Sequence, residues 1–451
     1  MDSTKNAKLL TAARTLVEEV ARNLDIDASV KLWDGSLVPL GREVKSDLRL
    51  TIASPGTIAS LVRWPTLDRM IRHYAQGNID LEGGTLIDLG HQLRDAAVRA
   101  RLKGMSKSAI ALRLLPFIPV WADPPGQSRN FAGNPSGADR RRGENQDFIR
   151  FHYDVGNEFY RLFLDPEMVY SCAYFTDWGN SLDEAQRDKL DMVCRKLRLK
   201  PGERLLDVGC GWGGLICHAA ANYGVEAHGI TLSQEQAAFA RARIAEQGLS
   251  ARVTVELTDY QDLAGEWDKI ASIGMYEHIG LANIPAYMAR VRGMLSNGGL
   301  FLNHAISSRA KRKRRRFGVR PEKKAIQKYI FPGGELDDIG HTVSAMEQAG
   351  FEVHDVEAWR WHYAHTTRLW CERLYRNRAK AEAIVGAQTT RIWLAYLAGC
   401  SLAFERATIF IFQTLASKRA KGQPPLPPTR EDLYDPSLRD RRRQLICHEE
   451  Q

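Results

Sequence analysis

Short apolar runs alternate with amphipathic helical patterns through the second half of the chain. The seven runs that predict strands cover residues 204–208, 225–230, 252–257, 269–274, 299–305, 351–359 and 407–416. Strands that alternate with helical crossovers form sheets whose two faces are both covered by helices. The pattern therefore predicts the α/β class, with a mostly parallel seven-stranded sheet and helices on both faces.

The first 122 residues show a different pattern, in which apolar positions recur at helical spacing. One apolar helix face between residues 5 and 24 is formed by Leu9, Ala13, Leu16, Val17, Val20 and Leu24. A second helical stretch, LIDLGHQLRDAAVRARL, covers residues 86–102. Apolar residues three and four apart are typical of a helix that packs on one side. We predict a smaller, mainly helical N-terminal domain over 1–122.

Composition changes again at the borders of these regions. Residues 123–147 are rich in Pro, Gly, Ser, Asn and Arg, which is typical of a linker, and residues 420–451 form a Pro-rich, charged tail. The intervening residues 148–419 hold the predicted sheet. Residues 110–121, IALRLLPFIPVW, are apolar but too short for a membrane span and are broken by Arg113, Pro116 and Pro119. That segment is suited to contact with a bilayer or an acyl chain.

Charge and cysteine content predict the class of partner and the cellular location of the protein. The formal net charge is +9, and basic residues concentrate at 311–316 (KRKRRR) and 439–443 (RDRRR), which favours a polyanionic partner. No aromatic platform or nucleic-acid motif accompanies these runs, so an anionic membrane surface is the expected partner and nucleic acid is not. The seven cysteines form no C-x-x-C pair and no metal-ligand spacing. Without a signal peptide, these features predict a cytoplasmic protein with reduced thiols and no metal.

The segment LLDVGCGWGG at 205–214 carries the first chemical signal. An apolar strand runs directly into Gly209, Gly211 and Gly214, and a helix follows. Glycines at such a turn allow the backbone to approach a ligand at the helix N-terminus. The spacing predicts a nucleoside cofactor, and by itself it also satisfies the dinucleotide pattern G-x-G-x-x-G.

The next strand helps to choose between a dinucleotide and S-adenosylmethionine. A dinucleotide site needs an acidic residue at the tip of the second strand, about 20 positions further on. Glu226 comes too early for that role, and the tip carries Thr231 and Gln236 instead. Asp207, just before the glycines, suits a ligand that bears an ammonium and a sulfonium. The methyl donor is favoured, with a nicotinamide or flavin enzyme as the alternative.

Five motifs in order then identify a family. They are HYDVGNEFY (152–160), LDPEMVYSCAYF (164–175), LLDVGCGWGG (205–214), GITLSQEQ (229–236) and GMYEHIG (274–280). Together they resemble the cyclopropane-fatty-acid synthase family, which includes the mycolic acid cyclopropane synthases, from about residue 148 to about residue 416. The resemblance implies a Rossmann-like class I methyltransferase fold. It also implies transfer of a methylene group from S-adenosylmethionine to a cis double bond of an unsaturated phospholipid acyl chain.

The resemblance also assigns residues to the methyl donor. Tyr170 and Ser171 would contact the methionine part, approached from the turn by Gly209 and Gly211. The residues that would meet the adenosine are Thr231, Leu232, Gln236, Asp259 and Tyr260. Gln236 would then stand where a ribose-binding acid is usual. The pair Asp259 and Tyr260 is nearer to the bacterial phospholipid branch of the family than to the mycolic branch.

A second group of residues follows from the base that the reaction needs. The resemblance implies a bound bicarbonate, held by the backbone of Cys172 and of Ile306 and by the side chains of Glu277, His304 and Tyr363. The ring of Tyr363 would also face a developing cation. Singly, such residues are more often structural, but their joint occurrence in matching motifs favours the site.

Three further positions depart from a simple assignment. Cys400 matches a cysteine often marked as catalytic in the family, although the chemistry needs no acyl-enzyme intermediate and a buried helix cysteine explains it as well. Tyr276 and His365 differ from the residues expected beside Glu277 and Tyr363. Both changes would bear on the acyl pocket.

Three alternatives remain at this point. A related small-molecule N-methyltransferase shares several motifs and would methylate an amine. The same acyl substrate could instead end in a methyl branch or a methylene group, because one proton decides the product. A lipid-binding or regulatory protein could use a decayed methyltransferase scaffold, although Asp207, Glu277, His304 and Tyr363 are all intact.

The expected location of the protein is peripheral, at the inner face of the membrane. The N-terminal domain would bind lipid or pair two subunits of a homodimer.

Overall fold

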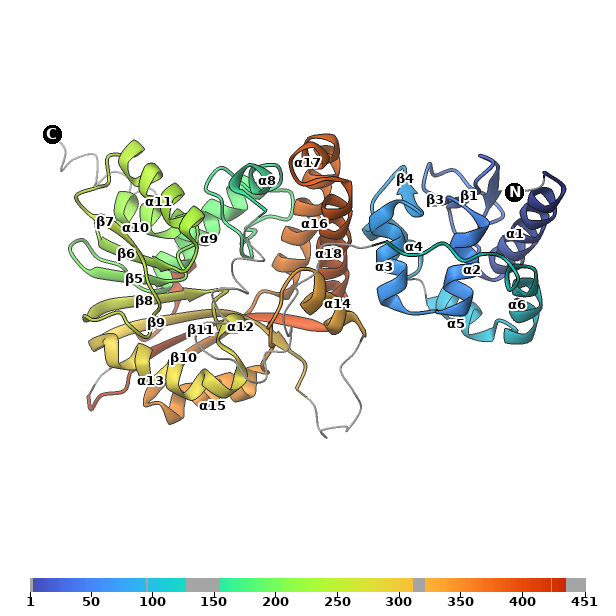
Figure 1. Cartoon of the computed structure of the whole chain (residues 1–451). Helices are drawn as coiled ribbons and strands as arrows, with labels where there is room; N and C mark the ends of the chain where they lie inside the picture. Colours follow the sequence, from blue (N-terminus) through green and yellow to red (C-terminus); the bar gives the residue numbers. More distant parts are fainter. Residues whose placement is uncertain (1–2, 95, 127–154, 311–320, 423, 435–451) are drawn as a thin grey trace. The chain divides into compact units, whose positions relative to one another are not determined.

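The computed structural model describes residues 3–94, 96–126, 155–310, 321–422 and 424–434 (Figure 1). The chain divides into two compact units. The small unit comprises Met1–Ala132, Gly318–Ile330 and Trp370–Leu402, and the large unit comprises the rest. Two segments of the predicted catalytic domain, 318–330 and 370–402, thus belong to the small unit. Most of the predicted linker and tail, and both basic runs, lie outside the described residues.

A seven-stranded sheet forms the centre of the large unit. Its strands are β5 (Arg204–Val208), β6 (Glu226–Thr231), β7 (Val253–Leu257), β8 (Trp267–Ile273), β9 (Leu295–Ser308), β10 (Phe351–Ala358) and β11 (Ile409–Lys418). The order is β10-β11-β9-β8-β5-β6-β7, and β11 runs antiparallel to both of its neighbours, whereas the other pairs are parallel. The predicted mostly parallel sheet of seven strands is confirmed.

Helices cover both faces of this sheet (Figure 1). One face carries α9 (Leu182–Lys196), α10 (Gly214–Tyr223) and α11 (Gln234–Glu246), and the other carries α13 (Ile284–Met294) and α15 (Ile339–Gln348). Successive strand residues point to opposite faces. Leu205 accordingly packs in the core beneath α9 and α10, whereas Leu206 and Val208 pack in the core beneath α13. The same alternation directs Asp207 to the α9 face.

The remaining helices of the large unit are short or are shared with the small unit. The short ones are α8 (Asn157–Arg161), α12 (Tyr276–Ile279), the 3-10 turn η2 (Leu281–Asn283) and α19 (Glu431–Tyr434). The first ten residues of α16 (Arg360–Arg376) and the last three of α18 (Ala387–Glu405) belong to the large unit. The rest of α16 and of α18 belongs to the small unit. The helix α17 (Arg378–Val385), which lies between them in sequence, and α14 (Pro321–Tyr329) also belong to that unit.

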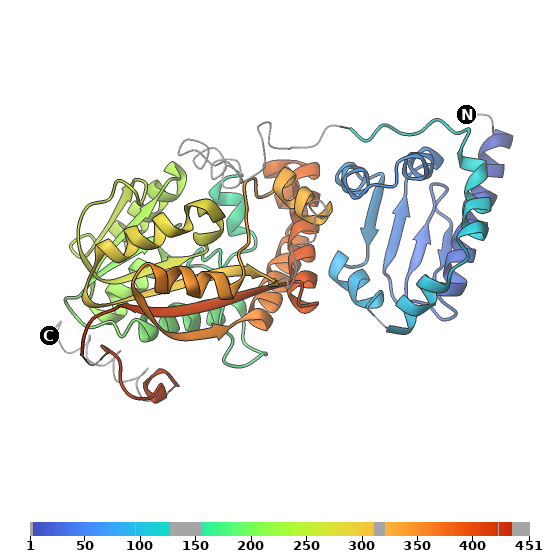
Figure 2. The same ribbon diagram turned by 90° about the horizontal axis from the view of Figure 1, so that it is seen from below.

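The small unit is mainly helical but also contains a sheet. Its N-terminal helices are α1 (Ser3–Leu24), α2 (Pro55–Arg63), α3 (Leu67–Gln76), α4 (Leu86–Gln92), α5 (Ala96–Gly104), α6 (Lys107–Leu114) and the 3-10 turn η1 (Leu115–Phe117). Four strands lie side by side in the order β2-β1-β3-β4 (Figure 2). They are β1 (Ser29–Lys31), β2 (Leu37–Pro39), β3 (Arg49–Ile52) and β4 (Ile79–Glu82).

The apolar face predicted for α1 packs as expected, with Leu9, Ala13, Val17 and Leu24 buried in the core of the small unit. The single helical stretch predicted over 86–102 is instead two helices, because α4 ends at a C-cap on Leu93. Among the helices that the structure describes, none combines the length and the hydrophobicity of a membrane crossing.

Candidate active site

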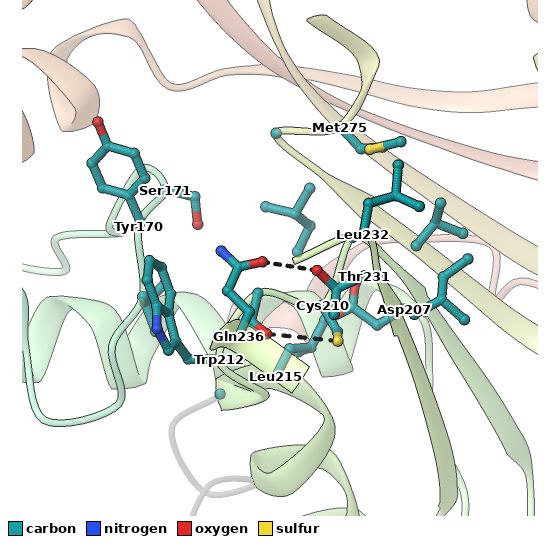
Figure 3. Close-up of a pocket in the computed structure, with 18 of the residues that line it drawn as sticks. Tyr170, Ser171, Asp207, Cys210, Trp212, Leu215, Thr231, Leu232, Gln236 and Met275 are labelled. Carbon is teal, nitrogen blue, oxygen red and sulfur yellow. Dashed lines mark hydrogen bonds between the residues drawn. The ribbon is translucent and has the colours of Figure 1, made fainter. Parts of the chain in front are cut away.

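A cavity lies at the carboxyl ends of the parallel strands of the large unit (Figure 3). Its walls are the turns after β5, β6, β7 and β8, together with residues 168–171 and one side of α9. Ligands of open α/β sheets bind at this edge. All ten residues predicted to meet the methyl donor line this one cavity: Tyr170, Ser171, Asp207, Gly209, Gly211, Thr231, Leu232, Gln236, Asp259 and Tyr260.

The glycine turn after β5 has the backbone that its sequence predicts. Gly209 and Gly211 adopt left-handed φ values of 84° and 55°, which residues with a side chain rarely adopt. A Cβ on Gly211 would meet no atom within 4 Å, so the turn is open at that point. A Cβ on Gly214 would lie 2.9 Å from the carbonyl oxygen of Glu167, so that glycine is needed for packing.

The tip of β6 is organised by neutral groups. The Thr231 hydroxyl donates to Oε1 of Gln236 at 2.8 Å, which leaves the amide NH₂ of Gln236 as the group directed into the cavity (Figure 3). Ser233 caps α11 by accepting from the Gln236 backbone N–H at 3.3 Å. Glu226 lies at the start of β6 and does not line the cavity. The acidic residue of a dinucleotide site is therefore missing from this tip.

A buried pair of opposite charges lies in the wall of the cavity. Burial raises the pKa of Asp207 to about 7, and the nearby ammonium of Lys189 opposes that rise. Burial lowers the pKa of Lys189 to about 8, against the attraction of Asp165 and Asp207. Within the described residues, Oδ1 of Asp207 is buried without a hydrogen-bond partner. A buried polar atom without a partner costs about 1–3 kcal/mol, so a ligand group is expected there.

Sequence reasoning missed several residues of this cavity. Among them are Lys189, Cys210, Trp212, Leu215, Thr258, Met275 and His278. Lys189 had a signal, because it falls four residues from both Ala185 and Val193 in the apolar stripe of α9, where a charged side chain needs a reason. The others carry no local signal that separates them from core residues.

The cavity fits S-adenosylmethionine by its chemistry. Asp207 offers a carboxylate oxygen for the α-ammonium of the donor, and the open turn at Gly211 leaves room beside the helix N-terminus. Thr231 and Gln236 provide neutral hydrogen-bonding groups for the nucleoside. When it is bound, S-adenosylmethionine supplies an activated methyl group.

Glu277 belongs to a second cluster, on the short helix α12 after β8. Its Oε1 accepts a hydrogen bond of 2.5 Å from the backbone N–H of Ile306 on β9. Burial raises the pKa of Glu277 to about 7, although this hydrogen bond opposes the rise. Among the described residues, no group bonds to its other oxygen, Oε2, which is buried. Glu277 can therefore hold or release a proton near neutral pH.

His304 lies on β9 opposite Gln413 of β11. The side-chain amide of Gln413 lies 2.9 Å from Nδ1 of His304, whereas Nε2 is buried with no partner within the described part of the chain. Burial, and then the positive charges of Lys189 and Lys196, hold the pKa of His304 well below its ordinary value. His304 is thus a neutral imidazole with one ring nitrogen available to a ligand.

Aromatic and aliphatic side chains enclose this second cluster. Cys172, Ile306 and Tyr363 pack in one apolar core with Trp359 and Phe404. The rings of Trp359 and His304 meet edge to face at 5.3 Å, and those of Tyr363 and Phe404 lie 4.6 Å apart. Five of the six predicted catalytic residues, Cys172, Glu277, His304, Ile306 and Tyr363, are thus connected through shared contacts.

Cys400 differs from the other five. It lies in the segment of α18 that belongs to the small unit. Burial raises the pKa of its thiol to about 12, against a hydrogen bond with Tyr396. It is therefore a neutral thiol at pH 7, which is a poor nucleophile.

The two unusual neighbours of the predicted site have structural contacts. The Tyr276 hydroxyl donates to Oδ2 of Asp337 at 2.9 Å, which fixes the start of α12. The ring of His365 meets the edge of Phe175 at 4.5 Å. Tyr276 therefore helps to hold Glu277, its neighbour in sequence, in place.

Comparison with known proteins agrees with this geometry. Residues 140–414 match the family model described as mycolic acid cyclopropane synthetase. A probable fatty acid methyltransferase of Pseudomonas putida is 39% identical over 92% of this chain and 98% of its own length. The cyclopropane-fatty-acyl-phospholipid synthase of Escherichia coli (strain K12) is also 39% identical, over 59% of this chain and 66% of its own.

A solved structure supports the fold assignment independently. The crystal structure of mycolic acid cyclopropane synthase CmaA1 complexed with SAH and CTAB has a TM-score of 0.57 and 34% identity, and the match covers 60% of this chain and 97% of that one. The family model matches more than half of the chain, and the cavity fits the donor. The chain belongs to the mycolic acid cyclopropane synthetase family of S-adenosylmethionine-dependent methyltransferases.

Proposed function

We propose that the protein transfers a methylene group from S-adenosylmethionine to the cis double bond of unsaturated phospholipid acyl chains, with bound bicarbonate as the base. The observation that carries the proposal is that Oε2 of Glu277 and Nε2 of His304 are buried without a partner among the described residues. Both residues border one apolar core, Glu277 through its bond to Ile306 and His304 through its ring contact with Trp359. The fatty acid and phospholipid named for the two relatives support an acyl substrate.

The residues of the second cluster suit this chemistry. An alkene is a weak nucleophile, so the apolar walls around Trp359 and Tyr363 serve by excluding water and orienting an acyl chain. Their ring faces can stabilise positive charge that develops on carbon. With its raised pKa, Glu277 can be protonated near pH 7, and the protonated carboxyl and the neutral His304 can each donate to a small oxyanion. Bicarbonate bound there would supply a base for the proton that must leave before a ring closes.

Dependence on bicarbonate tests this step. In buffer freed of carbon dioxide, we expect the rate of acyl modification to fall severalfold and to recover when bicarbonate is added. A small-molecule N-methyltransferase, the main rival, has no use for a base of this kind, because the nitrogen lone pair attacks directly. A rate that is independent of bicarbonate would contradict this part of the proposal.

A second product deserves a direct test, because the relative of Pseudomonas putida is called a fatty acid methyltransferase. A methyl-branched alkene would arise from the same substrate if the proton left a carbon of the acyl chain. A methylene group would arise if a hydride first shifted to the cationic carbon and the transferred methyl group then lost its proton. Mass spectrometry after ring-opening derivatisation distinguishes a cyclopropane ring from both. We expect the ring, because a held base near the reacting carbon favours loss of the proton from the transferred methyl group.

A surface of the small unit supports docking on an anionic membrane. Leu112, Leu115, Ile118 and Trp121 are exposed, Trp121 to 86%. The segment 96–121 contains five Lys or Arg residues and no Asp or Glu. Apolar side chains beside cations are typical of interfacial binding to anionic lipids. We therefore propose peripheral binding at the inner face of the membrane through residues 112–121.

A further inference from the structure

Lys189 is a buried lysine in the wall of the methyl-donor cavity. Its side chain projects from α9, the residue is only 2% exposed, and Nζ donates to the Ser171 hydroxyl oxygen at 3.0 Å. Among the residues that the structure describes, no carboxylate lies within 4.0 Å of Nζ. An ammonium has three N–H donors, and burying it without an anion in direct contact is expensive, although Asp165 and Asp207 attract it from a greater distance. An anionic partner is therefore expected from the ligand.

Ser171 is held in place by the same helix. Its hydroxyl oxygen accepts from Lys189, so the hydroxyl hydrogen remains available for donation to another group. Its backbone oxygen accepts from Nε2 of Gln186 at 3.0 Å, and Gln186 also binds the carbonyl of Val169 at 3.2 Å. Ser171 thus presents a fixed donor to the cavity (Figure 3), and the ammonium of Lys189 lies beside it.

Asp207 provides the opposite charge in the same cavity. Its Oδ1 is a buried acceptor that no described residue uses, and Lys189 and Asp207 attract one another electrostatically. The cavity therefore displays one cation with a hydroxyl donor and one carboxylate. An α-amino acid group, with its adjacent carboxylate and ammonium, has the complementary arrangement of charges.

We propose that Lys189, together with Ser171, binds the α-carboxylate of S-adenosylmethionine, and that Asp207 receives the α-ammonium. Lys189 is then a specificity residue for the amino acid part of the donor. The inference depends on the donor cavity and is independent of the acyl substrate and of bicarbonate. It gives a function to a charged side chain that lies in the apolar stripe of α9.

Calorimetric titration with two ligands tests the proposal without relying on turnover. S-Adenosylhomocysteine carries the α-carboxylate, and S-adenosyl-3-thiopropylamine lacks only that group. A charge-assisted hydrogen bond contributes about 1.5–3 kcal/mol, so the wild-type protein should prefer the first ligand by roughly 10- to 100-fold. In Lys189→Met, which keeps a side chain of similar length, the two affinities should become nearly equal.

Two further variants make the result specific. Ser171→Ala should reduce the same preference by a smaller factor, and it decides the question if Lys189→Met does not fold. Lys196→Met is the matched control, because Lys196 is a second buried lysine on α9 that is paired with Glu357 and does not line the cavity. Its preference between the two ligands should equal that of the wild-type protein.

The outcomes separate the proposal from the donor assignment on which it rests. If Lys189→Met, or Ser171→Ala in its place, weakens both ligands equally, the carboxylate contact is wrong although the donor cavity stands. If the wild-type protein binds neither ligand, the donor assignment itself fails, and this inference fails with it.

Discussion

Glu277 on α12 and Ile306 on β9 are joined by a hydrogen bond of 2.5 Å from the backbone N–H to Oε1. The donor is a backbone group of β9 that is held in place by the pairing of Ile306 with Ile411 of β11, so it cannot turn away. The bond therefore engages Oε1 of Glu277 and leaves Oε2 for a ligand.

Replacing Glu277 by Gln should remove most of the activity. The amide can still accept from Ile306 through its oxygen, but it cannot take or release a proton near pH 7 as a carboxyl of raised pKa can. We expect kcat to fall by about 100-fold or more, the usual size of a general acid–base contribution. Affinity for S-adenosylhomocysteine should change by less than about threefold, because that ligand binds in the methyl-donor cavity and not at Glu277.

Glu335→Gln is the matched control for that substitution. Glu335 also accepts from a backbone N–H, that of Leu281, at 3.0 Å, but its side chain is only half-buried, and it is its backbone that bonds to the Glu277 carbonyl. Full activity in Glu277→Gln, or an equal loss in Glu335→Gln, would argue against a role of Glu277 in catalysis.

Binding of the methyl donor should weaken below pH 7. Burial raises the pKa of Asp207 to about 7 in the folded protein, so the carboxyl is largely protonated at pH 6 and must lose its proton to receive an ammonium. Well below this pKa, the affinity for S-adenosylhomocysteine should fall by about tenfold per pH unit. Calorimetry in two buffers of different ionisation enthalpy should show proton release on binding at pH 6.

The contribution of Asp207 to folding stability changes with pH in the opposite direction to the affinity for the donor. Because its pKa is raised on folding, the folded state binds this proton more tightly than the unfolded state, and stability is lost as the pH rises from about 4 to 7. Asp207→Asn should abolish both effects. If donor affinity in the wild-type protein is flat between pH 5.5 and 8, Asp207 does not receive the ammonium.

Cys400→Ala should leave the activity within about twofold of the wild-type value. The thiol has a pKa of about 12, so almost none of it is ionised at pH 7, and the proposed reaction forms no acyl-enzyme. Steady-state rates on phospholipid vesicles measure this. A loss of more than tenfold in a variant with an unchanged Tm would show that Cys400 takes part in the chemistry.

Trp121→Ser should weaken binding to vesicles of an anionic phospholipid by about tenfold, because the exposed indole would no longer enter the interface. Co-sedimentation with vesicles measures the effect, and raising the salt concentration should weaken binding further. Trp361→Ser is the control, since Trp361 is also exposed but lies on the large unit. Equal losses in the two variants would place the membrane contact elsewhere.

The sheet of the large unit was predictable because its strands are long and apolar. Leu205, Leu206 and Val208 are buried on alternate faces, and a continuous apolar run records that directly. The four strands of the small unit were not predicted, because they have only three or four residues each and several of these are half-buried. Such runs are too short for periodicity to separate a strand from a loop.

The residues of the cavity were predictable where motifs mark them, as at Gly209 and Gly211. Lys189 was missed because its function depends on Ser171 and Asp207, which come from other elements and meet it only in the folded chain. The assignment of residues 370–402 to the small unit was missed for the same reason, since that unit combines segments distant in sequence.

The chemical identity of the acyl product tests the proposed function most directly. Purified protein should be incubated with S-adenosylmethionine, bicarbonate and vesicles of a phospholipid with one cis double bond in each chain, and the released fatty acids should be analysed by mass spectrometry. We predict that the acyl chains gain the mass of one CH₂ and lose their double bond to a cyclopropane ring. Acyl chains of unchanged mass, in a preparation that binds S-adenosylhomocysteine, would contradict the proposed function.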